Sequence, residues 1–189
     1  SGPAPVVFFN MYSLRNVSLY QNMFTSVIGS KVCGSVSSLH WFYEVSREKN
    51  ECSDNDEDPF LCDFIQSTNV GNGYSEDYWH CSSVALKCSW SGIGCTGGKI
   101  TSLALNRWRI TGTIPNSINK LKHLNWLGMS WNYLYGSIPS SIGNLTKLRS
   151  LELGNNFLTG SLPSSFKDLM YLDYFNVNTN KLSGTLPLI

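Results

Sequence analysis

One short phrase occurs four times in the second half of this chain, at a constant spacing of 24 residues. Each copy has a large aliphatic residue two positions before a glycine and a proline three positions after it; the glycines are Gly112, Gly136, Gly160 and Gly184. A fixed period of this length indicates a solenoid, in which each coil buries its apolar side chains against its neighbours. Because a solenoid presents a long regular surface, binding or assembly is the first functional expectation.

The repeat also contains a strand and a turn. Upstream of each glycine two apolar residues alternate with one other residue, as in Leu103-x-Leu105 and Leu151-x-Leu153. Such alternation indicates a short strand with one buried face, and strands stacked at one period form a parallel sheet. After each proline, apolar residues at a spacing of three predict a 3₁₀ or short helical turn on the convex side, over residues 116–124, 140–148 and 164–172.

An asparagine recurs between strand and glycine, at Asn132, Asn156 and Asn180. A buried asparagine must satisfy its amide, and a repeating one can do so on the backbone of neighbouring coils. The first repeat has Trp108 at this position, which fits the atypical terminal repeat of solenoids.

The whole pattern, LxxLxLxxNxLxGxIPxxIGxLxxL over residues 99–189, resembles the plant-type extracellular leucine-rich repeat. The preceding Cys88-Ser-Trp-Ser-Gly-Ile-Gly-Cys95 resembles the C-x-W-x-G-V-x-C element of that family's N-terminal cap, and residues 64–79 resemble the phrase before it. The resemblance implies a Cys88–Cys95 disulfide and a role in recognition. The cap covers an apolar end that the first strand would otherwise expose.

These observations divide the chain into three parts. Residues 1–63 contain no recognised repeat, residues 64–98 form the cap, and residues 99–189 form about four repeats. Within the first part, Pro5–Tyr12 is expected to be a strand and Ser38–Arg47 an amphipathic helix. The predicted fold is an α/β-type solenoid, a short right-handed coil with a parallel sheet, after a disulfide-bonded cap and an additional N-terminal α+β segment.

Six cysteines indicate an oxidising compartment. With Cys88 and Cys95 paired, Cys33, Cys52, Cys62 and Cys81 leave three connectivities, among which Cys33–Cys52 with Cys62–Cys81 is favoured. Two sequons, at Asn16 and Asn144, are expected to be used at least in part. Together these features predict a secreted or cell-surface protein.

Catalytic and metal sites are not expected. The acidic stretch Asp54–Asp58 starts with the spacing of a calcium loop, but Pro59 and Ile65 stand where an EF-hand needs Gly and Glu. The cysteines lack the spacing of a zinc site, and the three histidines lie in no catalytic phrase. No stretch is long and apolar enough to span a membrane. We therefore expect a protein that is not an enzyme, without cofactor, metal ion, nucleic-acid partner or membrane span.

The exposed face of the sheet is the candidate binding surface. Clustered Trp, Tyr and Arg side chains are common anchors at interfaces, and aromatic rings can also stack on sugars. The alternative is that some of these rings pack on neighbouring coils and stabilise the sheet. The residues expected on or beside this face are Arg107, Trp126, Trp131, Glu152, Tyr174 and Asn176.

Two functions remain open. The first is a recognition module that binds a protein, peptide or glycan on the concave face, as the resemblance implies. The second is a structural subunit whose last repeat, left open around Phe175, Val177, Leu182 and Leu186, joins the N-terminal region of the next copy into an extracellular filament. The opposite net charges of residues 1–79 (−6) and 80–189 (+7) favour such head-to-tail association.

Overall fold

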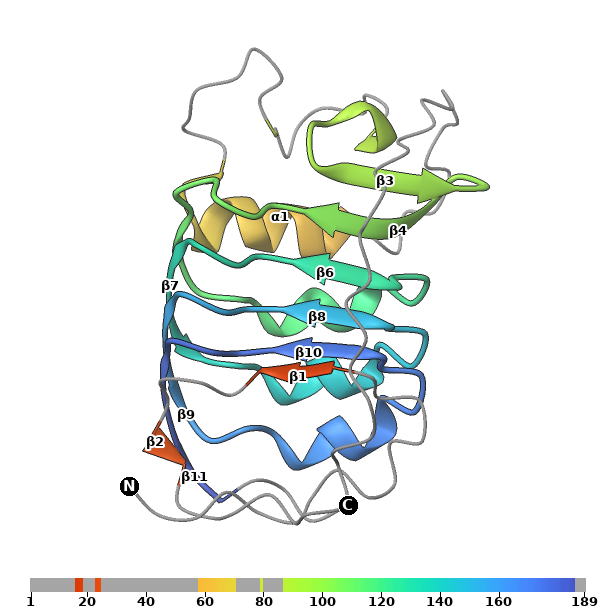
Figure 1. Cartoon of the computed structure of the whole chain (residues 1–189). Helices are drawn as coiled ribbons and strands as arrows, with labels where there is room; N and C mark the ends of the chain where they lie inside the picture. The colour runs from red at the N-terminus through yellow and green to blue at the C-terminus, as the bar shows by residue number, and fades with distance from the viewer. Residues whose placement is uncertain (1–15, 19–22, 25–57, 71–78, 80–86, 186–189) are drawn as a thin grey trace.

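The computed structural model of the chain describes residues 16–18, 23–24, 58–70, 79 and 87–185. The described coils stack into the expected leucine-rich repeat solenoid, with strands along one side and 3₁₀ turns behind them (Figure 1). The strands form two sheets, one on the broad face and one along the adjoining edge.

The first sheet has six strands. Four of them are parallel and come from the repeats, and each pairs with the equivalent strand 24 residues away, as Leu103 with Leu127 and Leu127 with Leu151. The antiparallel strand β3 closes the cap end. In spatial order the strands are β1 (Asn16–Ser18), β10 (Tyr174–Asn176), β8 (Ser150–Glu152), β6 (Trp126–Gly128), β4 (Lys99–Ala104) and β3 (Ile93–Thr96).

The second sheet lies after the asparagine of each repeat and contains the repeated glycines. Gly112, Gly136, Gly160 and Gly184 all have positive φ, as the sequence predicts, and an L-residue would be strained there. In spatial order the strands are β2 (Met23–Phe24), β11 (Lys181–Gly184), β9 (Phe157–Gly160), β7 (Tyr133–Ser137) and β5 (Thr111–Gly112).

The predicted turns behind the sheet are 3₁₀ helices, namely η3 (Asn116–Lys120), η4 (Ser140–Asn144) and η5 (Ser164–Asp168). Each begins directly after the repeat's proline, which is in the extended region, with φ −74° and ψ 154° at Pro115. A proline fixes φ and cannot donate a hydrogen bond, so it suits the residue at which the chain enters the turn.

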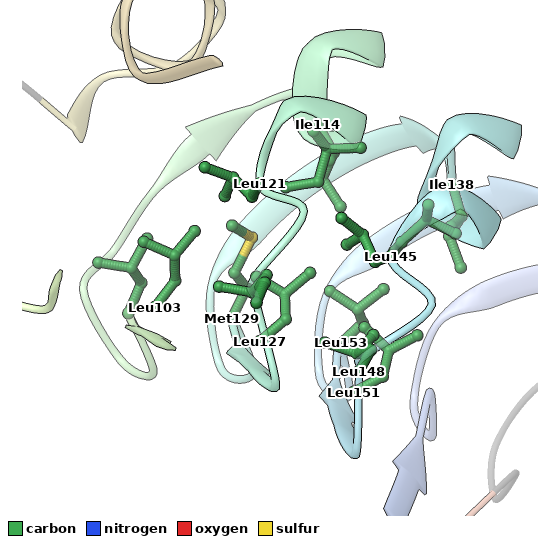
Figure 2. Close-up of a cluster of buried hydrophobic side chains, with 14 of the residues drawn as sticks. Leu103, Ile114, Leu121, Leu127, Met129, Ile138, Leu145, Leu148, Leu151 and Leu153 are labelled. Carbon is green, nitrogen blue, oxygen red and sulfur yellow. The ribbon is translucent and has the colours of Figure 1, made fainter. Parts of the chain in front are cut away.

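The core is a column of aliphatic side chains between the sheets and the turns. Each coil contributes side chains from its strand and its 3₁₀ turn, and Leu103, Leu127 and Leu151 follow one another from coil to coil (Figure 2). These three leucines are fully buried, as are Leu121 and Leu145 from the turns. Because every coil covers the next, the core is continuous from cap to last repeat.

The recurring asparagines are buried and bonded to the backbone of two coils. Asn156 Oδ1 accepts a hydrogen bond from Leu134 N at 3.0 Å, and its Nδ2 donates to Met129 O and Leu153 O, both at 3.0 Å. Asn132 and Asn180 make the equivalent bonds. The first coil has Trp108 in place of this asparagine. There, Asn69 Oδ1 of the cap accepts a hydrogen bond from Thr111 N at 2.8 Å.

The cap packs an aromatic cluster onto the first coil. The α-helix α1 (Asp58–Ser67) buries Phe60 and Phe64, and Trp79 lies 5.5 Å from Trp90 and 6.4 Å from Trp108, measured between ring centroids. The boundary drawn between residues 63 and 64 falls inside this helix.

The cap also contains the disulfide that the resemblance implies. Cys88, in the short helix η2 (Lys87–Ser89), is bonded to Cys95 of β3, with a Cα–Cα distance of 5.6 Å. Cys62 is also in a disulfide, whose partner lies outside the described residues. The proposed pairings Cys33–Cys52 and Cys62–Cys81 therefore stay predictions.

The expectation of an open, apolar last repeat is wrong. Phe175, Val177 and Leu182 are buried, with 1%, 0% and 0% of their surface exposed. The reason is that β1 pairs with β10 and β2 pairs with β11, so strands from the N-terminal region cover this end in both sheets. The strand expected over Pro5–Tyr12, the helix over Ser38–Arg47, the acidic stretch up to Glu57 and Leu186 lie outside the described residues.

Candidate ligand-binding surface

The strand face is the solvent side of the first sheet, the side expected to be concave. Residues in register across its parallel strands form two rows. One row contains Ser102, Trp126, Ser150 and Tyr174, and the other contains Ala104, Gly128, Glu152 and Asn176. The structure therefore brings four of the six predicted binding residues, Trp126, Glu152, Tyr174 and Asn176, onto neighbouring strands.

Glu152 is the centre of a polar cluster that joins three coils. Its Oε1 accepts hydrogen bonds from Trp126 Nε1 at 2.7 Å and from Ser150 Oγ at 3.3 Å. Its Oε2 accepts from Asn106 Nδ2 at 3.2 Å, and Asn106 Oδ1 in turn accepts from Ser130 N at 2.7 Å. An ionised carboxylate has about four acceptor positions, so one position on Oε2 stays available to a ligand.

Gly128 leaves the space that the side chains of this cluster occupy. A Cβ added at Gly128 would lie 3.0 Å from Asn106 Nδ2 and 3.2 Å from a ring carbon of Trp126. Both side chains therefore lie across Gly128, which is buried beneath them. Any larger residue would push the indole away from Glu152.

At the other end of the strand face, Asn176 is fixed by an amide network that also includes the preceding coil. Asn176 Oδ1 accepts a hydrogen bond from Asn178 N at 3.0 Å, and Asn155 Nδ2 donates to Asn178 Oδ1 at 3.3 Å. Gly154 lies beneath these amides, since a Cβ there would lie 2.6 Å from Asn176 Oδ1. Tyr174, beside Asn176 in β10, is half-buried.

Arg107 and Trp131 lie apart from the other four residues, at the corner between the two sheets. Both have positive φ, 65° and 60°, and Asn155 and Thr179 repeat this conformation at the same period. The Arg107 guanidinium lies 5.3 Å from the centroid of the Trp131 ring, a cation–π contact. Trp131 is nonetheless 56% exposed, so it adds apolar surface beside the strand face.

The second sheet carries an aromatic ladder, made of Tyr133, Phe157 and Lys181, that was not predicted from the sequence. The rings of Tyr133 and Phe157 stack with centroids 6.2 Å apart and planes at 14°, and Lys181 Nζ lies 5.4 Å from the Phe157 centroid. The three residues follow one another at 24-residue intervals, and that spacing was the available signal. Because these ring faces contact each other and a cation, they favour the structural alternative over stacking on sugars.

The border of the strand face opposite the ladder is basic. Lys147 Nζ lies 3.3 Å from His123 Nδ1, and Arg149 forms a 3.3 Å ion pair with Asp173. Burial, and next the charges of Lys147 and Lys99, hold the pKa of His123 below its ordinary value. The imidazole is therefore neutral at pH 7 and can accept a hydrogen bond from Lys147.

Asn144 is exposed at the end of η4, away from the strand face, and Asn16 lies in β1 in register with Tyr174. Among the residues that the structure describes, no three His, Cys, Asp or Glu side chains gather in a way that could hold a metal ion. Within the same residues, no helix is long and apolar enough to cross a membrane.

Comparison with known families supports the repeat pattern directly. The family described as Leucine Rich Repeat matches residues 123–145 and 147–169, two consecutive coils of the solenoid. The two matched segments are leucine-rich repeats. The matched segments contain β6, Trp126, Ser150 and Glu152, so these members of the Glu152 cluster belong to typical repeats, and Asn106 lies in the coil before them.

Known relatives are plant receptors. Over 54 residues, 29% of this chain, the sequence is 40% identical to the leucine-rich repeat receptor protein kinase EMS1 of Arabidopsis thaliana. The fold is similar to the leucine-rich repeat ectodomain of the Arabidopsis membrane receptor kinase GASSHO1/SCHENGEN3, solved with CASPARIAN STRIP INTEGRITY FACTOR 2, at a TM-score of 0.56 and 32% identity over 65% of this chain. It is also similar to the Arabidopsis receptor kinase HAESA, solved with the peptide hormone IDA and the co-receptor SERK1, at a TM-score of 0.61 and 25% identity over 70% of this chain.

The matches cover a small part of these relatives. The aligned region spans 4% of EMS1, 15% of the GASSHO1/SCHENGEN3 chain and 23% of the HAESA chain. The repeats are therefore the shared feature.

Proposed function

We propose that this chain is an extracellular, non-enzymatic recognition module that binds a peptide, or an extended segment of a protein, on its strand face. The observation that carries the proposal is the Glu152 cluster: a carboxylate fixed by Trp126, Ser150 and Asn106, with one acceptor position open. Of two similar receptor kinase structures, one contains the peptide hormone IDA and the other CASPARIAN STRIP INTEGRITY FACTOR 2, which supports a ligand of this kind.

The chemistry of the face favours a ligand with a basic or other hydrogen-bond-donating group. Glu152 is the one carboxylate in the described repeat strands β4, β6, β8 and β10, and its position is fixed before any ligand arrives. A lysine, an arginine or a free amino terminus would donate a charge-assisted hydrogen bond to the remaining acceptor position of Glu152. Trp126 and Tyr174, one on each side of Ser150 in the same row, would supply apolar contact to the rest of the peptide.

A peptide is favoured over a glycan. On the second sheet Phe157 stacks on Tyr133 and Lys181 lies over the Phe157 ring, and at the corner Arg107 lies over Trp131. These contacts compete with stacking on a sugar, which needs a free ring face. Trp126 is in turn fixed edge-on to a carboxylate through its Nε1.

The test is selection from a displayed library of random peptides on the purified, disulfide-bonded chain. We expect enrichment of peptides with a basic residue, and about tenfold to a hundredfold weaker binding by Glu152→Gln, because one charge-assisted hydrogen bond is lost. The matched control is Asp168→Asn, which makes the same charge change at an exposed position in η5. Failure to enrich any peptide, or equal weakening by Asp168→Asn, would count against the proposal.

The structure does not favour a head-to-tail filament as a second function. It depended on an open last repeat, and the described strands of that repeat are paired within the same chain.

A further inference from the structure

The strands that come first in the chain lie last in the solenoid. In both sheets the order ends with a repeat strand next to an N-terminal strand, β10 next to β1 and β11 next to β2 (Figure 1). All four of these strands run parallel to their partners, as the repeat strands do.

The register of β1 is that of a further repeat. In the first sheet, equivalent residues of successive coils face each other, as Leu151 faces Phe175. On the far side of β10, Phe175 faces Val17. Val17 therefore takes the repeat position of Phe175, the first buried apolar residue of a repeat strand, in the coil that would come next.

The second sheet gives the same alignment independently. There each residue pairs with one that lies 22 positions later in the chain, as Thr159 with Lys181 and Gly160 with Leu182. At the next step Ser183 pairs with Met23 and Gly184 with Phe24. Met23 thus takes the repeat position of Lys181, and Phe24 that of Leu182.

One ungapped alignment satisfies both sheets, because Val17 and Phe24 are separated in sequence by the same distance as Phe175 and Leu182. Under this alignment the apolar and asparagine positions of the repeat fall on matching residues, namely Leu14, Val17, Leu19, Asn22, Phe24 and Ile28. The segment reads LxxVxLxxNxFxxxI. It departs from the repeat at two positions, where Ser26 replaces the glycine and Gly29 replaces the proline.

We infer that residues 14–28 carry the pattern of a fifth leucine-rich repeat, whose strands β1 and β2 dock in the same chain on the edge formed by β10 and β11. The edge recognises this segment as it would recognise a following coil: through the parallel backbone pairing of two strands and through the apolar surface of Phe175 and Leu182. Docking adds a strand to the strand face, so the proposed binding surface continues from Tyr174 and Asn176 onto β1.

Cysteine cross-linking of the full chain tests this inference. Ser18→Cys with Asn176→Cys places two thiols on facing residues of neighbouring strands, about 5 Å apart at Cα and within the range of a disulfide. Met23→Cys with Ser183→Cys does the same in the second sheet. The control pair, Ser18→Cys with Glu152→Cys, is one strand further apart, at about 10 Å, and is too distant.

The readout is peptide mapping by mass spectrometry, on equal mixtures of isotope-labelled and unlabelled chains, after checking that the Cys88–Cys95 disulfide is intact. We expect both facing pairs to form the new disulfide within one chain in most molecules, and the control pair to form it in few. Cross-links that join labelled to unlabelled chains would overturn docking in the same chain and revive head-to-tail exchange. Equal cross-linking of facing and control pairs, or none in either, would overturn the register and with it the fifth repeat.

Discussion

Trp126 and Glu152 belong to successive coils, yet the indole Nε1 and the carboxylate Oε1 are 2.7 Å apart. The contact crosses the strand face diagonally, above Gly128, and it positions a charged group whose remaining partners are Ser150 and Asn106. A carboxylate held by three donors is a prepared acceptor, because its ordering cost is met by folding rather than by the ligand.

The first prediction concerns the asparagine ladder. Asn156→Ala should lower the free energy of unfolding by about 3 kcal/mol or more, because Leu134 N, Met129 O and Leu153 O lose a buried partner. Urea unfolding followed by circular dichroism measures the change. Asn116→Ala, at an exposed residue in the first position of η3, is the control and should change the free energy by about 0.5 kcal/mol or less. Equal effects of the two variants would contradict this role of the ladder.

The second prediction separates cap docking from backbone strain. Gly112 and Gly160 share a repeat position and a positive φ, but a Cβ at Gly112 would overlap Ser67 O and Thr68 Cα, whereas at Gly160 the nearest atom would be 3.6 Å away. Gly160→Ala should therefore cost about 1 kcal/mol of strain. Gly112→Ala should cost clearly more, and should expose the cap helix to proteolysis. Thermal unfolding and limited proteolysis would show whether Gly112→Ala is instead as mild as Gly160→Ala.

The third prediction addresses the aromatic ladder. A double-mutant cycle with Tyr133→Leu and Phe157→Leu should give a coupling of about 0.5–1.5 kcal/mol, since the rings stack at 6.2 Å. Neither single variant should alter binding of a selected peptide, because the ladder lies on the second sheet. Zero coupling together with lost binding would assign the ladder to recognition.

The fourth prediction follows from His123. Its pKa is lowered by burial and then by the charges of Lys147 and Lys99, so Lys147→Met should raise it toward the ordinary value. Since the pKa in the folded state lies below that of the unfolded chain, the unfolded chain binds more protons in acid. The contribution of His123 to stability is therefore full above its ordinary pKa and is lost as the pH falls through the folded-state pKa. An NMR titration of the imidazole Cε1 proton measures the shift, and a pKa unchanged by Lys147→Met would contradict this cause.

The repeat made much of this architecture predictable. The positive φ of Gly136, the buried Asn156 and the 3₁₀ turn after Pro139 each follow from one residue type at one period. The Cys88–Cys95 bond followed from the resemblance of the cap.

The closed end of the solenoid was not predicted, for a physical reason. The N-terminal segment keeps the apolar and asparagine positions of a repeat but has Ser26 and Gly29 where the glycine and proline stand, and those two residues were the signal that defined the period. Its partners Phe175 and Leu182 are more than 150 residues away in sequence, so only the register in both sheets reveals the match.

The arrangement of the proposed binding residues could be predicted only in part. Position in the repeat placed Trp126 and Glu152 on neighbouring strands, but not the hydrogen bond between them, which depends on the space above Gly128. Arg107 and Trp131 were grouped with the strand face because they follow the strands directly. The positive φ at both residues turns the chain at the corner, and their side chains pair there instead.

One measurement tests the proposed binding surface most directly: the indole N–H resonances of the ¹⁵N-labelled chain during titration with a library-selected peptide, with Trp126→Phe and Trp131→Phe used for assignment. Trp126 donates to Glu152, whereas Trp131 lies at the corner beneath Arg107, so the two resonances report different surfaces. We predict that the Trp126 resonance shifts with saturation and that the Trp131 resonance stays in place. A shift of the Trp131 resonance with no change at Trp126 would contradict recognition on the strand face.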